Sequence, residues 1–132
     1  DQFCQKYINR EPIEILGNGM QKRDFMHIMD AVRLYAQIAR ANKCRSGIYN
    51  VGGPETISIR GLADLVNDIG ESIFGHRVPI IFKEGQSGAG WHDFKYDYSK
   101  AIMEFQYKPA FTLDDFLKER LLLEMRNKNA KK

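Results

Sequence analysis

Short strand-like runs alternate with amphipathic helical stretches along this chain, and the alternation limits its fold more than any other feature. Residues 13–16, 48–51 and 78–82 are apolar or alternating runs bounded by glycine, proline or polar residues, which is typical of short strands. The longer stretches between them repeat apolar residues at helical spacing. Strands separated by helices predict an α/β fold.

Each helix predicted after residue 10 has a polar residue placed to cap its first turn. These N-cap candidates are Asp30, Ser58, Asp97 and Thr112. Gly75 stands where a glycine commonly closes a helix. The sequence before residue 10 also has amphipathic helical spacing. The side chains expected to face inward are Ala31, Leu34, Tyr35 and Ile38, then Leu62, Leu65, Val66, Ile69 and Ile73, then Leu113, Phe116, Leu117 and Leu121.

Two further segments have extended character, and the run at residues 48–51 is bounded by glycines. Residues 24–28 alternate, and so do the aromatic residues Phe94, Tyr96 and Tyr98. Residues 47–53 form a β-prone run between glycines, which predicts a buried strand ending in a turn with positive φ. No repeat or linker divides the chain, so residues 1–132 are expected to form one unit.

Composition bounds the class of protein. The chain has 43% hydrophobic and 28% charged residues, which excludes disordered and low-complexity classes. No apolar run is long enough to span a bilayer, and the first residues do not resemble a signal peptide. Cys4 and Cys44 fit no metal or redox spacing, which favours reduced thiols and a cytoplasmic location. The basic tail, residues 126–132, indicates a solvated helix end rather than a nucleic-acid site.

The sequence has few signatures of catalysis. His27, His76 and His92 lie in separate segments without metal-ligand spacing, so no metal is expected. His92 and Asp93 are adjacent on an extended segment and therefore point to opposite faces. Residues 85–90, GQSGAG, superficially resemble a dinucleotide-binding turn, but the residues that follow have strand periodicity, whereas such a turn opens a helix.

A glycine turn that delivers two cations is more informative. Residues 17–25 read GNGMQKRDF and place Lys22 and Arg23 a few residues after the turn. The planar guanidinium of Arg23 could bind a diphosphate through two parallel hydrogen bonds. The alternative is a surface arginine paired with Asp24 or Asp30.

In this segment the sequence resembles the NAD-dependent epimerase/dehydratase family, the extended short-chain dehydrogenases that modify nucleotide sugars. The resemblance rests on the sequence PIEILGNGMQKRDFMHIMDA at residues 12–31, which is similar to the family signature gdGxqxRDFxHVxDxA. Three further stretches agree in order and spacing. They are IYNVGG at 48–53, the helix at 58–69, and DYSKA at 97–101 followed by YKP at 107–109.

The resemblance implies the C-terminal, substrate-binding part of an extended Rossmann-type enzyme. Nothing in this chain matches the family's GxxGxxG cofactor turn or its catalytic YxxxK pair. It therefore implies that NAD or NADP and the catalytic residues belong to a missing N-terminal part. This chain alone would bind no cofactor and be inactive. By the same resemblance, Arg23 contacts the diphosphate of a nucleoside-diphosphate sugar, and Glu14 and Leu16 lie along the nucleobase.

The chain departs from the family at the second phosphate site, where relatives carry RxGD and this sequence has KEGQ at residues 83–86. Lys83 could replace the arginine as a point charge, and Gln86 could hydrogen-bond a ribose hydroxyl. The expected partners are the nucleoside-diphosphate sugar, the missing N-terminal part and a second copy in a homodimer, without nucleic acid or membrane. The rival hypothesis is a stand-alone binding or interaction module without catalytic activity.

Overall fold

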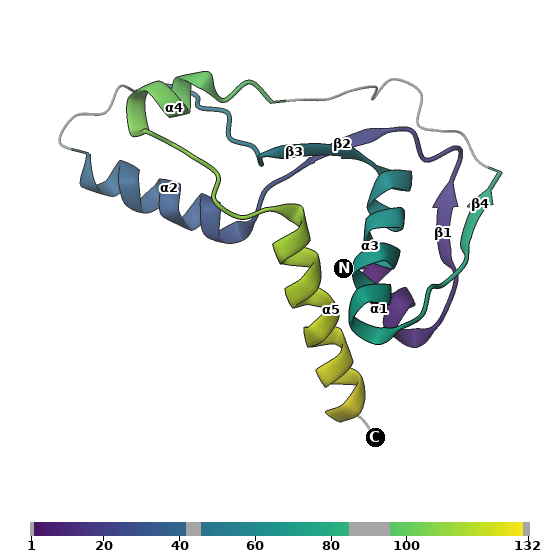
Figure 1. Cartoon of the computed structure of the whole chain (residues 1–132). Helices are drawn as coiled ribbons and strands as arrows, with labels where there is room; N and C mark the ends of the chain where they lie inside the picture. Colours follow the sequence, from purple (N-terminus) through teal and green to yellow (C-terminus); the bar gives the residue numbers. More distant parts are fainter. Residues whose placement is uncertain (1, 42–45, 85–95, 131–132) are drawn as a thin grey trace.

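The computed structural model describes residues 2–41, 46–84 and 96–130. Figure 1 shows its arrangement: α2 and α4 lie at one end, the strands β1 and β4 lie at the other, and α3 and α5 lie between them. In chain order the elements are α1 (Gln2–Asn9), β1 (Ile13–Leu16), β2 (Lys22–Phe25), α2 (Ile28–Arg40), β3 (Glu55–Ser58), α3 (Ile59–Phe74), β4 (Ile80–Lys83), α4 (Ser99–Phe105) and α5 (Leu113–Ala130).

The strands form two small sheets. β1 pairs with β4 in parallel, with Ile13 opposite Ile80 and Leu16 opposite Lys83. β2 and β3 form an antiparallel pair, with Arg23 opposite Ile57. Helices separate β1 from β4 along the chain, as a parallel pair requires. The predicted α/β fold, with short strands alternating with helices, is confirmed.

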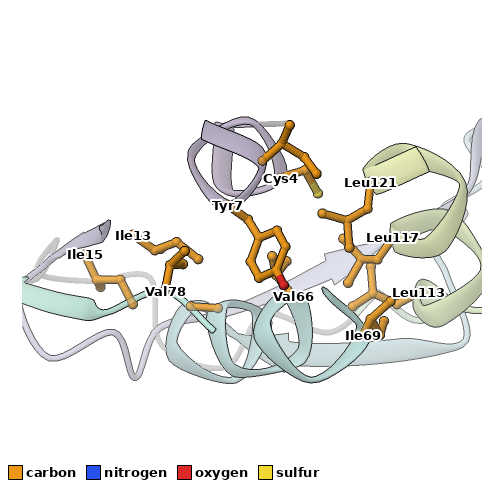
Figure 2. Close-up of a cluster of buried hydrophobic side chains, with 12 residues drawn as sticks. Cys4, Tyr7, Ile13, Ile15, Val66, Ile69, Val78, Leu113, Leu117 and Leu121 are labelled. Atoms are coloured by element: carbon orange, nitrogen blue, oxygen red, sulfur yellow. The ribbon is translucent and has the colours of Figure 1, made fainter. Parts of the chain in front are cut away.

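The larger core lies where α1, α3 and α5 meet beneath β1. Figure 2 shows Tyr7 of α1 inserted between these elements. Gly70 makes room for that ring, because a Cβ there would lie 2.2 Å from the Tyr7 ring. The buried residues of this cluster are Cys4, Tyr7, Ile8, Ile13, Ile15, Ala63, Val66, Ile69, Val78, Leu113, Leu117 and Leu121. The predicted inward face of the last helix is thus confirmed.

A second, smaller cluster joins α2 to α4. Its buried members are Leu34, Ala101, Phe105 and Tyr107, and Tyr49 and Val51 pack against it. The Tyr107 hydroxyl donates to the carbonyl of Gly52 at 2.7 Å. This cluster lies at the end of the molecule opposite β1 and β4 (Figure 1).

Most predicted helix ends are confirmed. The Ser58 hydroxyl accepts from the Gly61 N–H at 3.0 Å, and Gly75 closes α3 with φ of 73°. The Thr112 hydroxyl accepts from the Asp115 N–H at 3.2 Å. Asp97 accepts from the Ser99 N–H at 2.9 Å, although the N-cap position itself is Tyr98.

The predicted N-cap role of Asp30 is wrong. α2 begins three residues earlier than expected, and the ring Nδ1 of His27 accepts from the Met29 N–H at 3.1 Å as the cap. Asp30 lies in the first turn and is 1% exposed. Its carboxylate accepts from the backbone N–H groups of Ala110 at 3.0 Å and Phe111 at 3.3 Å. A local pattern could not show this, because both partners lie 80 or more residues away.

The predicted buried strand at residues 48–51 is also wrong. This segment forms no strand, and Ile48 is 88% exposed. Side chains take the place of strand partners: the Lys100 ammonium donates to the Ile48 carbonyl at 3.1 Å, and Tyr107 donates to Gly52. A strand without a neighbouring strand leaves its backbone groups unpaired.

The two glycines that follow this segment have a different purpose from the one predicted. Among the described glycines, positive φ occurs at positions 17, 19 and 75 only, so the predicted positive φ at Gly52 or Gly53 is wrong. A Cβ on Gly53 would lie 1.5 Å from the carbonyl oxygen of Phe25. Gly53 therefore allows a close approach between two backbone segments.

The extended segments differ from their predicted limits. β2 begins and ends earlier than residues 24–28, because Ile28 already starts α2, and β4 begins at Ile80 rather than Val78. β3 was not predicted. Tyr96 and Tyr98 are not in a strand, and Phe94 lies outside the described residues.

Two residues of the predicted inward faces are exposed. Tyr35 of α2 is 71% exposed, and Ile73 near the end of α3 is 38% exposed. Around Tyr35, α2 turns an apolar surface outward. This surface, the outer face of α2, consists of Ile28, Met29, Val32 and Tyr35.

Candidate functional site

The parallel pair β1–β4 brings together three of the predicted site residues. Ile13 and Ile15 of β1 point into the core, so Glu14 and Leu16 point to the opposite face, where Leu16 is 65% exposed. A Glu14 carboxylate oxygen lies 2.9 Å from the Lys83 ammonium. This hydrogen bond lowers the pKa of Glu14 below its ordinary value. The pair forms because the parallel register places the two strand ends side by side.

The glycine turn at the end of β1 fixes how the chain reaches β2. Gly17 and Gly19 have φ of 72° and 68°, a conformation that glycine adopts without steric cost. The Gly17 N–H donates to the Lys83 carbonyl at 3.0 Å, and the Arg60 N–H donates to the Gly19 carbonyl at 2.9 Å. The turn is thereby attached both to β4 and to the start of α3.

Arg23 lies on β2, and its side chain is exposed. Its guanidinium donates to the neighbouring Lys22 carbonyl at 2.8 Å. The alternative of an ion pair with Asp24 or Asp30 is not realised. Asp24 accepts from the Gly53 N–H at 2.7 Å, and Asp30 is engaged by residues 110 and 111. Within residues 2–41, 46–84 and 96–130, Arg23 has no carboxylate partner.

Arg60 also borders the turn, although its position in the sequence did not indicate a site. It is the second residue of α3, and its guanidinium carbon lies 5.4 Å from the centroid of the Phe82 ring. The signal available in the sequence was an arginine directly after a capped helix start. That signal is weak, because most such residues simply face solvent.

An apolar cavity of about 210 Å³ lies between the starts of α2 and α5. The His27 ring stacks on Phe111 with centroids 4.4 Å apart at its wall. The other lining residues are Phe25, Met26, Ile28, Thr112, Leu113 and Phe116. Of the predicted site residues in the described ranges, none lines this cavity.

Some predictions fall on residues outside the described ranges. These are Gln86, the glycine-rich stretch 85–90, and the His92 and Asp93 pair. In the described part, no group of three histidine, cysteine, aspartate or glutamate side chains could hold a metal ion. No helix in the described part is both long and apolar enough to cross a bilayer.

Comparison with known proteins shows which enzymes this chain is similar to in sequence. Residues 1–52 match the model of the NAD dependent epimerase/dehydratase family. The uncharacterized UDP-glucose epimerase YtcB of Bacillus subtilis is 28% identical over 88% of this chain and 35% of its own length. UDP-glucuronic acid decarboxylase 1 of Arabidopsis thaliana is 26% identical over 96% of this chain and 27% of its own length. The chain therefore spans about a third or less of these curated relatives.

The same relationship appears in three dimensions. The crystal structure of UDP-glucuronic acid 4-epimerase from Bacillus cereus, in complex with UDP-glucuronic acid and NAD, matches with a TM-score of 0.78 at 27% identity. The match covers 95% of this chain and 38% of that one. Over most of its length the chain is thus similar to part of the nucleotide-sugar epimerases and decarboxylases, and its first 52 residues match the NAD dependent epimerase/dehydratase family.

Proposed function

We propose that this chain is the C-terminal, substrate-binding part of an NAD-dependent nucleotide-sugar epimerase or dehydratase, and that it binds a nucleoside-diphosphate sugar. The observation that carries the proposal is the position of Arg23 beside the glycine turn, exposed and without a carboxylate partner in the described residues. Both nearby carboxylates of its own segment are engaged elsewhere. A guanidinium left in this state is suited to bind phosphate oxygens in pairs.

The other predicted contacts complete this site. Leu16 offers an exposed apolar surface to the nucleobase. Glu14 fixes the position of Lys83, which contributes a positive charge at the rim of the proposed site, at the end of β4. Gln86 remains a predicted contact to the ribose. The relatives' names and the bound ligands of the Bacillus cereus enzyme support a uridine diphosphate sugar as the first ligand to test.

The remainder of the longer protein would supply the cofactor, NAD or NADP, and the catalytic residues. Support comes from the share of its relatives that this chain covers, 35% of the Bacillus subtilis protein and 38% of the Bacillus cereus enzyme. We further propose that the outer face of α2 packs against that remainder, and that the complete protein is a homodimer. A hydride would pass from a sugar carbon to the nicotinamide and back, outside this chain.

The test of the site is substitution of Arg23 in the full-length protein that contains this chain. Arg23→Ala should weaken binding of UDP-glucose by about 1.5–3 kcal/mol, the range for a lost charged hydrogen bond. Isothermal titration calorimetry measures the change. Arg40→Ala, at the end of α2, is the matched control and should leave the affinity unchanged. An Arg23→Ala protein that folds and binds as well as wild type would refute the assignment.

A second test concerns the cofactor. Calorimetric titration of NAD into the isolated 132-residue chain should give no saturable binding, because no cofactor turn followed by a helix is recognisable in its sequence. A micromolar dissociation constant would overturn this expectation and assign cofactor binding to residues 85–90. The upstream reading frame separates the proposal from the stand-alone module, which predicts a start codon close to Asp1 instead of GxxGxxG and YxxxK motifs.

A further inference from the structure

Arg60 is held at the glycine turn by contacts on two sides. Its backbone N–H donates to the Gly19 carbonyl at 2.9 Å, and a Cβ on Gly19 would lie 3.1 Å from the Arg60 Cβ. Its guanidinium lies over the Phe82 ring of β4. The start of α3, the turn and the end of β4 therefore meet at this one side chain.

Cations from three elements border the turn. Arg23 follows it on β2, Arg60 lies at the start of α3, and Lys83 ends β4, where its carbonyl accepts from the Gly17 N–H. Lys83 is paired with Glu14 at 2.9 Å. Among the described residues, Arg23 and Arg60 have no carboxylate partner. Two arginines on elements that border the same turn thus lack a counter-ion in the described part of the chain.

The contact with Phe82 leaves the binding edge of Arg60 available. Among the described residues, the Arg60 side chain makes no hydrogen bond and no ion pair, so the N–H groups that bind phosphate are not occupied. The contact with Phe82 consequently orients Arg60 while these donors stay available for a ligand. Lys83 differs in both respects, because its ammonium already donates to Glu14 and has no planar fork.

We propose that Arg60 is the second diphosphate-binding arginine of this site, acting with Arg23 on the two phosphates of a nucleotide. This inference rests on the proposed function, and it assigns to Arg60 the second phosphate contact that the sequence alone suggested for Lys83. Lys83 remains at the rim, paired with Glu14. Phe82 is the positioning residue for Arg60.

The experiment compares three probes in the full-length protein that contains this chain: UDP, UMP and uridine. Arg60→Gln should weaken UDP binding by about 10-fold or more, the effect of one lost charge-assisted contact. UMP should lose less, and uridine binding should not change. Calorimetry gives all three affinities. Arg40→Gln removes the same charge at the distant end of α2 and should leave all three unchanged.

A conservative variant separates binding from folding. Arg60→Lys keeps the charge but loses the planar fork, so UDP should again be weakened relative to uridine, by less than in Arg60→Gln. It is used on its own if Arg60→Gln does not fold. Equal UDP affinity in wild type and both variants would overturn the inference, and so would an equal loss for UDP and uridine. If Arg23→Ala weakens UDP while the Arg60 variants do not, only the inference fails. If wild type binds no UDP, the proposed function itself fails.

Discussion

Asp30 shows how one buried carboxylate connects distant parts of the chain. It joins the first turn of α2 to the segment before α5 through the N–H groups of Ala110 and Phe111, and Arg33 lies 3.4 Å from it. Within the described residues, the buried side chains with a charged or amide group are those of Asp30 and Asn67. The position of α5 relative to α2 therefore depends on Asp30.

Asp30→Ala should destabilise the protein markedly. The buried carboxylate accepts both hydrogen bonds, and each hydrogen bond to a charged group contributes about 1.5–3 kcal/mol. Urea unfolding of the isolated chain, followed by circular dichroism, measures the difference. Glu119→Ala on the exposed side of α5 serves as the control and should change stability little. Equal stability of Asp30→Ala and wild type would show that these donors find other acceptors.

Tyr107 gives a prediction at alkaline pH. The side chain is 2% exposed, and burial raises its pKa from 10.0 to about 12. Between these values the unfolded chain releases the phenolic proton while the folded chain keeps it, so stability should fall as pH rises from 10 to 12. Tyr107→Phe should show a shallower decline over that range in thermal unfolding. Identical pH profiles would contradict the assignment.

At the level of elements, the caps that lie within one turn are the best predicted features. Thr112 and Asp115 form a reciprocal pair at the start of α5: the Thr112 N–H donates to the Asp115 carboxylate at 3.2 Å, and the Thr112 hydroxyl accepts from the Asp115 N–H. Ser58 and Gly75 bound α3 in the same local way. These contacts join residues at most four positions apart, so the sequence displays them directly.

Thr112→Ala should lower stability by about 1 kcal/mol, the usual value of a lost N-cap. A hydrogen bond from Thr112 also holds the pKa of Asp115 below its ordinary value of 3.8. As pH falls, the Asp115 carboxyl therefore binds a proton in the unfolded chain before it does so in the folded chain. The ionised carboxylate stabilises the folded chain fully above pH 3.8, and this stabilisation is lost as pH falls through the lowered pKa. In acid unfolding, Thr112→Ala should differ from wild type less at pH 2 than at pH 6.

Elements that depend on distant partners were predicted less well. β3 was missed because its run is short and polar at its first residue, and it forms only because β2 lies beside it. Residues 48–51 have strand character but no strand partner in the described part. The candidate site shows the same contrast between local motifs and long-range contacts. Arg23 was found through its motif, whereas the contact of Arg60 with Phe82 joins residues 22 positions apart on different elements and leaves no periodic signal.

At the scale of the whole molecule, the outer face of α2 is an exposed apolar surface that is expected to affect how the chain behaves in solution. Tyr35 is 71% exposed, Ile28 69% and Val32 48% on this one helix face. Exposed apolar groups that lie together mark interaction surfaces. The isolated 132-residue chain is therefore expected to self-associate through this face.

Tyr35→Lys should shift the isolated chain toward monomer, as measured by multi-angle light scattering across a range of concentrations. Met103→Lys on α4 is a suitable control, because Met103 is also exposed but lies outside the outer face of α2. Equal association of both variants and wild type would place the contact elsewhere. A wild-type chain that is monomeric at every concentration would favour the stand-alone module.

The separation of the two hydrophobic clusters has a consequence for local opening. The smaller cluster, around Leu34, Phe105 and Tyr107, shares no buried residue with the core beneath β1. Regions with few buried apolar contacts open at lower free energy than the global transition. Amide protons of α2 and α4 should therefore exchange with deuterium well before those of α3. The glycine turn at residues 17–19 is hydrogen-bonded to β4 and to the start of α3, on the side of the larger core. Under the proposed function, a nucleotide bound there would therefore meet a site that is already in place.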